Sequence, residues 1–210
     1  MERSTGIVAT AIAGMLGVTF YVVAWAVAGV LTPDYDPLRQ AISETFALGA
    51  PVVPATLVRV SLVVSGIALV AFAWALDRGL PGTGRAGPAV CAISGVLTVF
   101  LVAFPCTAGW PGVGASFTDT MHVIVAGGGY LTLLVTPVLI ALRVREHLPV
   151  FARWSLVLGG LALLGFVVRN LGFEVLPGLQ QRTFNTIADA WYVVAGVVLI
   201  LRVRRHEGGR

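Results

Sequence analysis

The chain has 210 residues, of which 57% are hydrophobic and only 11% are charged, and its mean hydropathy is +0.91. A soluble domain normally carries about 25% charged residues, so the composition excludes an ordinary soluble protein and predicts an integral membrane protein. The formal net charge of +4 comes from 14 arginines, with no lysine, against 10 acidic residues. We expect these arginines at membrane boundaries and in ion pairs, and we expect no nucleic-acid partner.

The first expected membrane span covers residues 6–31 and contains no charged residue. It is long enough for a membrane helix, which needs about 20 apolar residues. A cleavable signal peptide would explain the Ala26–Ala28 triplet. The apolar run is too long and the first residues are too weakly basic for one, so we expect a retained helix.

A polar, patterned segment follows from Pro33 to Pro51, between two strongly apolar blocks. Asp36 suits an N-cap, Pro37 suits the first helical position and Gly49 suits the end of a helix. The segment therefore predicts a short interfacial helix over residues 37–48. Four residues share one face of that helix: Gln40, Ser43, Glu44 and Ala47.

Five further apolar runs predict five more spans, over residues 56–76, 88–104, 120–142, 154–168 and 184–201. In the fourth span, Gly127–Gly129 would let another helix approach closely. Cys91 and Cys106 lie near opposite ends of the third span, about 22 Å apart in helix rise, which excludes a disulfide between them. The sequence thus predicts one all-α membrane domain, residues 1–210, with six transmembrane helices.

The distribution of arginine predicts the orientation of this domain. If both termini are cytoplasmic, ten arginines lie on the inner side of the membrane. The outer side then holds four: Arg39, Arg59, Arg169 and Arg182. The positive-inside rule therefore favours an N-in, C-in protein of the cell membrane.

Polar residues gather at helix ends on the expected outer side. Ionisable residues within spans are costly, and they usually face the interior of a bundle or a wet cavity. In the sixth span Arg182, Asn185 and Asp189 share a face by their spacing. The candidate acid–base residues are Asp189, His122, Glu44 and Asp119. The candidate ligand-binding residues are Arg59, Arg169, Arg182, Asn185, Ser43 and Arg39.

Several candidates also have a purely structural interpretation. Arg59 and Arg169 can extend to lipid headgroups, Asp189 can pair with a buried arginine, and Ser43 can be an ordinary polar surface residue. A zinc site needs three or four ligands, and His122 is the one histidine on the expected outer side, so we expect no metal and no cofactor. We expect Trp110, Trp191 and Tyr192 to lie either in an interfacial aromatic belt or on the wall of an apolar ligand site.

Motifs along the chain resemble those of the DUF998 family. They are YDPLRQAISETFALGAP after the first span, AFP at the end of the third, TDTMHVIVAG at the start of the fourth and GLQQR before the sixth. The most specific of them holds Pro37, Arg39, Ser43 and Glu44. The resemblance covers nearly the whole chain and implies a six-helix bacterial or archaeal membrane protein. Because the family's function is unknown, it implies no activity.

Three functions remain open from the sequence. The favoured one is an outward-facing pocket that binds a membrane lipid or isoprenoid-type ligand, with Arg169 and Arg182 on its headgroup. The second is an enzyme that uses Asp189 or Glu44 as acid or base with His122 as proton partner, for headgroup hydrolysis or transfer or for isoprenoid cyclisation. The third is a non-catalytic structural or partner subunit.

Overall fold

The computed structural model describes residues 2–109, 113–173 and 175–208. Six helices dominate it: α1 (Glu2–Leu31), α2 (Val52–Gly79), α3 (Ala86–Phe100), α4 (Phe117–Val144), α5 (Pro149–Asn170) and α6 (Pro177–Gly208). Two 3₁₀ helices, η1 (Ile42–Phe46) and η2 (Leu101–Ala103), follow α1 and α3. Six helical segments are long and apolar enough to cross a membrane, and no strand is found in the described ranges. The predicted all-α fold with six spans is confirmed.

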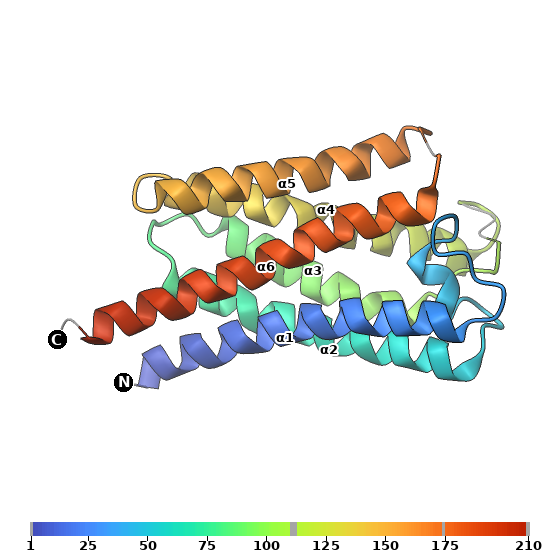
Figure 1. Ribbon diagram of the computed structural model, residues 1–210, viewed down its shortest axis with the longest axis horizontal. Coiled ribbons are helices and arrows are strands. Elements are labelled where there is room, and N and C mark those ends of the chain that lie inside the picture. Colours follow the sequence, from blue (N-terminus) through green and yellow to red (C-terminus); the bar gives the residue numbers. More distant parts are fainter. Residues whose placement is uncertain (1, 110–112, 174, 209–210) are drawn as a thin grey trace.

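The six helices form a closed ring in chain order (Figure 1). Each helix packs against the next, α6 closes the ring against α1, and α6 also contacts α2 and α4. Both termini lie at one end of the bundle, which we call the terminal end. The opposite end, the η1 end, holds η1 and the α1–α2, α3–α4 and α5–α6 loops.

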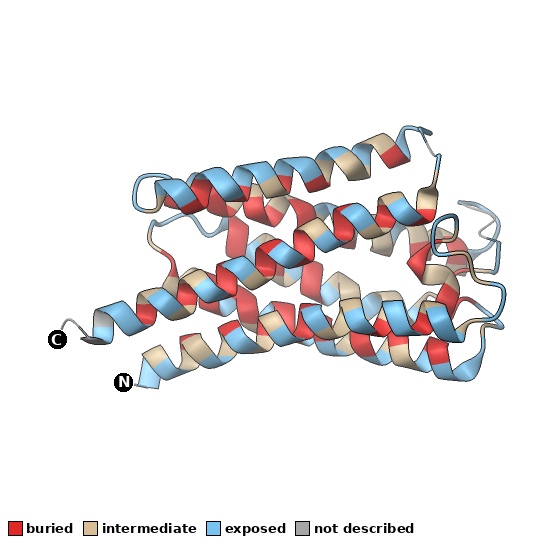
Figure 2. Ribbon diagram, viewed as in Figure 1, coloured by how far each residue is buried: buried red, intermediate tan, exposed pale blue. Residues whose placement is uncertain are grey.

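Burial divides each helix into an inner and an outer face (Figure 2). Large apolar side chains such as Leu16, Ile67 and Leu164 are exposed on the outside, as expected for a surface in contact with lipid chains. The inside holds apolar side chains together with buried polar ones, among them His122 and Asp189. An isolated polar group is costly in hydrocarbon, so this distribution keeps the polar groups away from lipid.

Glycines set the distance between some of these helices. A Cβ atom on Gly66 of α2 would lie 2.6 Å from the carbonyl oxygen of Gly95 on α3, so the two backbones touch there. In the predicted glycine run of α4, the Ser94 hydroxyl donates to the Gly129 carbonyl oxygen at 3.1 Å. Gly127 differs, because a Cβ there would meet nothing within 4 Å. Close helix contact is therefore present at Gly129 and absent at Gly127, which faces open space.

The short helix after the first span is present, but it is a 3₁₀ helix of five residues instead of a helix over residues 37–48. Asp36 does not cap it. Instead, the Asp36 side chain accepts the N–H of Leu38 at 2.9 Å and its carbonyl accepts the N–H of Gln40 at 2.8 Å, which makes a turn. The expectation of an aromatic belt is wrong for Trp191 and Tyr192, which are buried inside the bundle; Trp110 lies outside the described residues.

Candidate functional site

Side chains of two predicted site residues form hydrogen bonds with the backbone at the two ends of η1. At its start, Glu44 accepts the N–H of Ala41 through Oε1 at 2.8 Å. At its end, Nη2 of Arg59 donates to the Phe46 carbonyl oxygen at 3.0 Å. Both charged groups therefore satisfy backbone atoms of this irregular segment.

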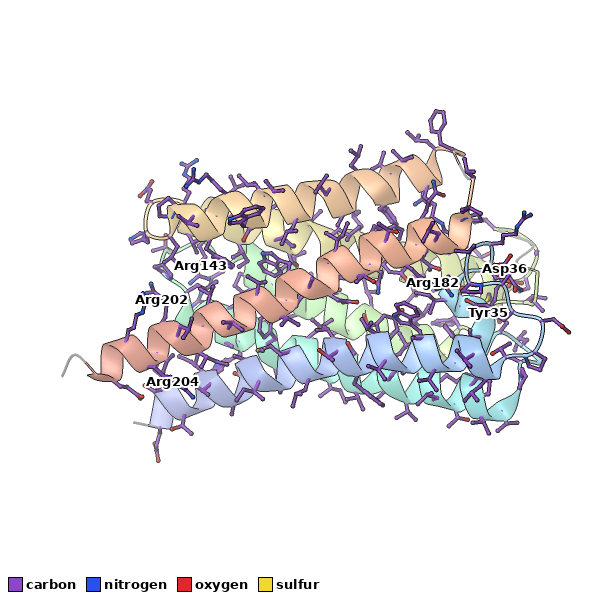
Figure 3. The ribbon with its side chains drawn as sticks, viewed as in Figure 1. Tyr35, Asp36, Arg143, Arg182, Arg202 and Arg204 are labelled. Carbon is purple, nitrogen blue, oxygen red and sulfur yellow. The ribbon has the colours of Figure 1, made fainter. Side chains whose placement is uncertain are left out.

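Arg182 on α6 anchors the loop between α1 and η1 (Figure 3). Its Nη1 donates to three backbone oxygens, those of Pro37 at 2.7 Å, Gln40 at 2.9 Å and Gly178 at 3.0 Å. Its Nη2 donates to the hydroxyl of Tyr35, and the guanidinium also lies over the ring of Trp25, 5.4 Å from its centroid. Burial raises the pKa of Tyr35, and the charge of Arg182 partly opposes this shift. Both Nη groups of the predicted ligand-binding arginine therefore bind the protein itself.

Asp119 organises the loop that precedes α4. Its Oδ1 accepts the N–H of Thr107 at 2.7 Å, and its Oδ2 accepts the hydroxyls of Thr107 at 2.9 Å and Ser116 at 2.7 Å. Ser116 is the N-cap of α4 and accepts the Asp119 N–H at 3.0 Å. Because both carboxylate oxygens are engaged, this residue is suited to holding the loop and poorly suited to acid–base chemistry.

His122 lies one turn further along α4 and is also buried. Its Nδ1 is 2.7 Å from the carbonyl oxygen of Phe104. Since a carbonyl only accepts, Nδ1 carries the proton, and Nε2 is the acceptor of the neutral ring. The ring packs near that of Phe46 of η1, with centroids 6.1 Å apart.

Cys106, in the loop after η2, is buried beside η1. Its thiol donates to the Ser43 carbonyl oxygen at 3.6 Å, and burial raises its pKa to about 11. Cys91 is also a free, buried thiol. A protonated thiol is a poor nucleophile, so Cys106 contributes to packing at neutral pH.

Two adjoining cavities lie inside the η1 end of the bundle. The η1-side cavity, about 70 Å³, has His122, Arg169, Ser43 and Gln181 among its lining residues. The central cavity, about 50 Å³, reaches Asp189 and Asn185 deeper in the bundle. The two cavities share five lining residues: Tyr21, Leu62, Leu101, Ala126 and Tyr130. Each has room for a few water molecules.

A line of polar side chains connects η1 with Asp189 along these cavities. Gln181 accepts the Ile42 N–H at 2.8 Å and donates to the Tyr130 hydroxyl at 3.1 Å. Tyr130 and Tyr21 both line the two cavities. Beyond them, Nδ2 of Asn185 donates to Oδ2 of Asp189 at 2.8 Å.

The structure sorts the predicted residues into three groups. Asp189 and Asn185 meet at the central cavity, and His122, Arg169 and Ser43 line the η1-side cavity. Glu44, Arg59, Asp119 and Arg182 hold loops. Arg39 lies apart: its side chain is 78% exposed and pairs with Asp36 at 3.6 Å.

Three residues of the polar line, Tyr21, Tyr130 and Gln181, were missed from the sequence. Gln181, Asn185 and Asp189 are spaced by four, which places them on one face of α6, and this spacing was a usable signal for Gln181. Within the described part of the chain, no group of three or more His, Cys, Asp or Glu side chains could hold a metal ion.

Comparison with known proteins gives one match. The model of a protein family described as "Protein of unknown function (DUF998)" matches residues 15–198. No curated protein and no solved structure matches the chain. The match covers all six helices in whole or in part, including both cavities.

Proposed function

Since that match spans most of its length, the chain belongs to the DUF998 family, and we propose that its two cavities bind the polar end of a lipid or isoprenoid-type ligand. The single observation that carries the proposal is the pair of adjoining cavities with Asp189 at the inner end. Intramembrane ionisable residues that face a cavity commonly mark ligand sites or proton relays. Arg169, which is buried on the wall of the η1-side cavity, supplies the positive charge that a phosphate or carboxylate group needs.

The size of the cavities limits what enters them. Sites for whole small molecules have volumes of about 300–1,000 Å³, whereas these cavities measure about 70 and 50 Å³. We therefore assign them to the polar terminal group of the ligand and leave its apolar chain in the bilayer.

The route for that chain runs between α4 and α5. The η1-side cavity is lined there by Gly127 of α4 and by Phe166 and Asn170 of α5. Asn170 is exposed, and Gly127 has open space where a side chain would be. From the distribution of arginines we place this end on the extracytoplasmic side of a bacterial or archaeal cell membrane.

A pair of glycine substitutions tests the proposal. A Cβ on Gly127 or on Gly160 meets nothing within 4 Å, so a side chain can begin at either position without a backbone clash. At Gly127 the leucine fills the η1-side cavity, whereas Gly160 is exposed on the outer face of α5. Lipids that co-purify with wild type, Gly127→Leu and Gly160→Leu from native membranes are quantified by mass spectrometry, relative to total phospholipid.

We expect a defined lipid or isoprenoid to be enriched on wild type and on Gly160→Leu, and lost from Gly127→Leu. Asp189→Asn should reduce or change the enriched species, because it alters the inner end of the site. Identical bulk lipids on all four proteins would refute ligand binding, and would favour a structural or partner subunit.

A catalytic form of the proposal uses Asp189 as the acid or base. The hydroxyls of Tyr130 and Tyr21 favour it, because both line the cavities between Asp189 and the η1 end and a hydroxyl can both donate and accept a proton. Glu44 and Asp119 are less suited, since their oxygens bind backbone and hydroxyl donors. Once the ligand is known, Asp189→Asn should abolish its conversion while the protein still accumulates. Unchanged turnover would exclude this role.

A further inference from the structure

The terminal end of the bundle carries a second site candidate, a groove between α5 and α6. Its volume is about 650 Å³, which lies in the range of about 300–1,000 Å³ typical of small-molecule sites. Its floor and walls are apolar, with Val150, Phe151, Trp154, Leu158, Val198 and Leu201 among the lining residues. Trp154 is 60% exposed at the groove. Nothing in the η1-end cavities extends to this groove.

Positive charge borders the groove on its α6 side. Arg202 and Arg205 lie one turn apart on α6 and both line it. The ion pairs with acidic residues found among the described residues involve Arg39, Arg78, Arg85 and Arg143, all of them elsewhere. The Nε atom of Arg202 is buried and has no hydrogen-bond partner in the described part of the chain. The groove thus combines an apolar channel with two guanidinium groups that have no acidic partner among the residues that the structure describes.

We infer that the groove binds an anionic phospholipid. One acyl chain lies along the apolar wall between α5 and α6, and the phosphate lies at the edge, where Arg202 and Arg205 donate to its oxygens. Arginine suits this role because its fork of donors matches two phosphate oxygens at once. Exposed Trp154 fits the interfacial position of such a site, since tryptophan favours the headgroup level. Basic pockets between membrane helices are a recognised form of anionic-lipid site.

α6 offers a matched pair of arginines for the test. Figure 3 shows Arg202 on the side of α6 that faces α5, and Arg204 on the side toward α1. Arg204 is exposed and does not line the groove. Arg202→Gln and Arg204→Gln therefore each remove one positive charge from α6. The first removes it at the groove and the second removes it away from the groove.

The experiment measures which lipid contacts Trp154. The full-length protein is reconstituted in phosphatidylcholine vesicles with increasing fractions of phosphatidylglycerol that carries brominated acyl chains, which quench tryptophan. A parallel series contains brominated phosphatidylcholine. Trp154→Phe in each background gives the signal of the other tryptophans, and the difference isolates Trp154. Both leaflets have the same composition, so the orientation of the protein does not affect the result.

In wild type we expect half-maximal quenching at a lower fraction of brominated phosphatidylglycerol than of brominated phosphatidylcholine. Arg202→Gln should reduce this preference about fivefold, the effect of about 1 kcal/mol for one arginine near the membrane surface. Arg205→Gln should act in the same direction, and Arg204→Gln should keep the wild-type preference. Equal quenching by both lipids in wild type would overturn the inference. An equal loss in Arg202→Gln and Arg204→Gln would also overturn it, because general surface charge would then explain the preference.

Discussion

Replacing Arg182 with glutamine should release the loop between α1 and η1. The substitution removes the cation that donates to the carbonyl oxygens of Pro37 and Gln40. A hydrogen bond with a charged partner contributes about 1.5–3 kcal/mol. Because the site is only partly buried, we take the lower value for each of these two bonds. The loop should then lose about 3 kcal/mol of local stability.

This loss of stability is large enough to measure by amide hydrogen exchange. About 3 kcal/mol corresponds to a roughly 150-fold larger population of the open loop, and amide hydrogen exchange reports that population. The relevant amides are those of Gln40, which donates to Asp36, and Leu179, which donates to Leu38. We expect their protection to fall by about that factor in protein held in lipid nanodiscs, while amides of the α2–α3 interface stay protected. Arg182→Lys should give an intermediate loss, because one ammonium group cannot replace a planar fork.

Arg39→Gln is the matched control in the same loop. Arg39 is largely exposed and pairs with Asp36 at 3.6 Å, and an exposed pair of this kind contributes about 0–1 kcal/mol. Its removal should therefore leave the exchange of Gln40 and Leu179 nearly unchanged. Equal exchange in Arg182→Gln and Arg39→Gln would show that Arg182 does not anchor the loop.

Two further predictions concern the same end of the protein. The pKa of Cys106, raised by burial to about 11, keeps the thiol protonated at neutral pH and lets it ionise only as the pH approaches that value. The test uses a Cys91→Ala background, in which N-ethylmaleimide can modify Cys106 alone. In protein unfolded in detergent the pKa of cysteine is about 8.5, so at pH 7.5 the native thiol should react at least about 300-fold more slowly than the unfolded one, in proportion to its smaller thiolate fraction. Similar rates would contradict the buried position of Cys106. Asp119→Asn replaces an acceptor by a donor opposite the hydroxyls of Thr107 and Ser116, so it should cost about 1–3 kcal/mol and lower the melting temperature in a fixed detergent. It should also leave the co-purified lipid of wild type in place, and a protein that melts normally but loses its lipid would argue for a direct role of Asp119.

The six helices were predictable because the signal for them is local. Each apolar run exceeds or approaches the length of a membrane helix, and the turns between them carry Gly, Pro or charge. The prediction of a helix over residues 37–48 was wrong, because contacts with residues far away in the sequence determine the structure of this segment. Arg182 lies more than 140 positions away along the chain and donates hydrogen bonds to the carbonyl oxygens of Pro37 and Gln40. The side chain of Gln181 accepts a hydrogen bond from the N–H of Ile42. These contacts favour turns and a short 3₁₀ helix at that place.

The site was only partly predictable. Charged residues such as Asp189 stand out within an apolar span, so they were identified as candidates. Tyr21 and Tyr130 did not stand out, because tyrosine fits an apolar helix as readily as it fits a polar line. Which candidates share a cavity depends on the rotation of six helices about their axes, and one sequence does not specify that rotation.

At the η1 end, the residues that hold the loops differ from the acidic residue inside the cavity, and this separates architecture from binding. At the η1 end, irregular backbone lies near the membrane, where its carbonyl groups need donors. Arg59 and Arg182 supply them, so substituting either one disturbs the loop whether or not a ligand binds. Asp189 accepts its hydrogen bond from Asn185 on the same helix and none from a loop among the described residues. Asp189→Asn should therefore leave loop protection unchanged, and any change in bound lipid that it causes reports on the cavity itself.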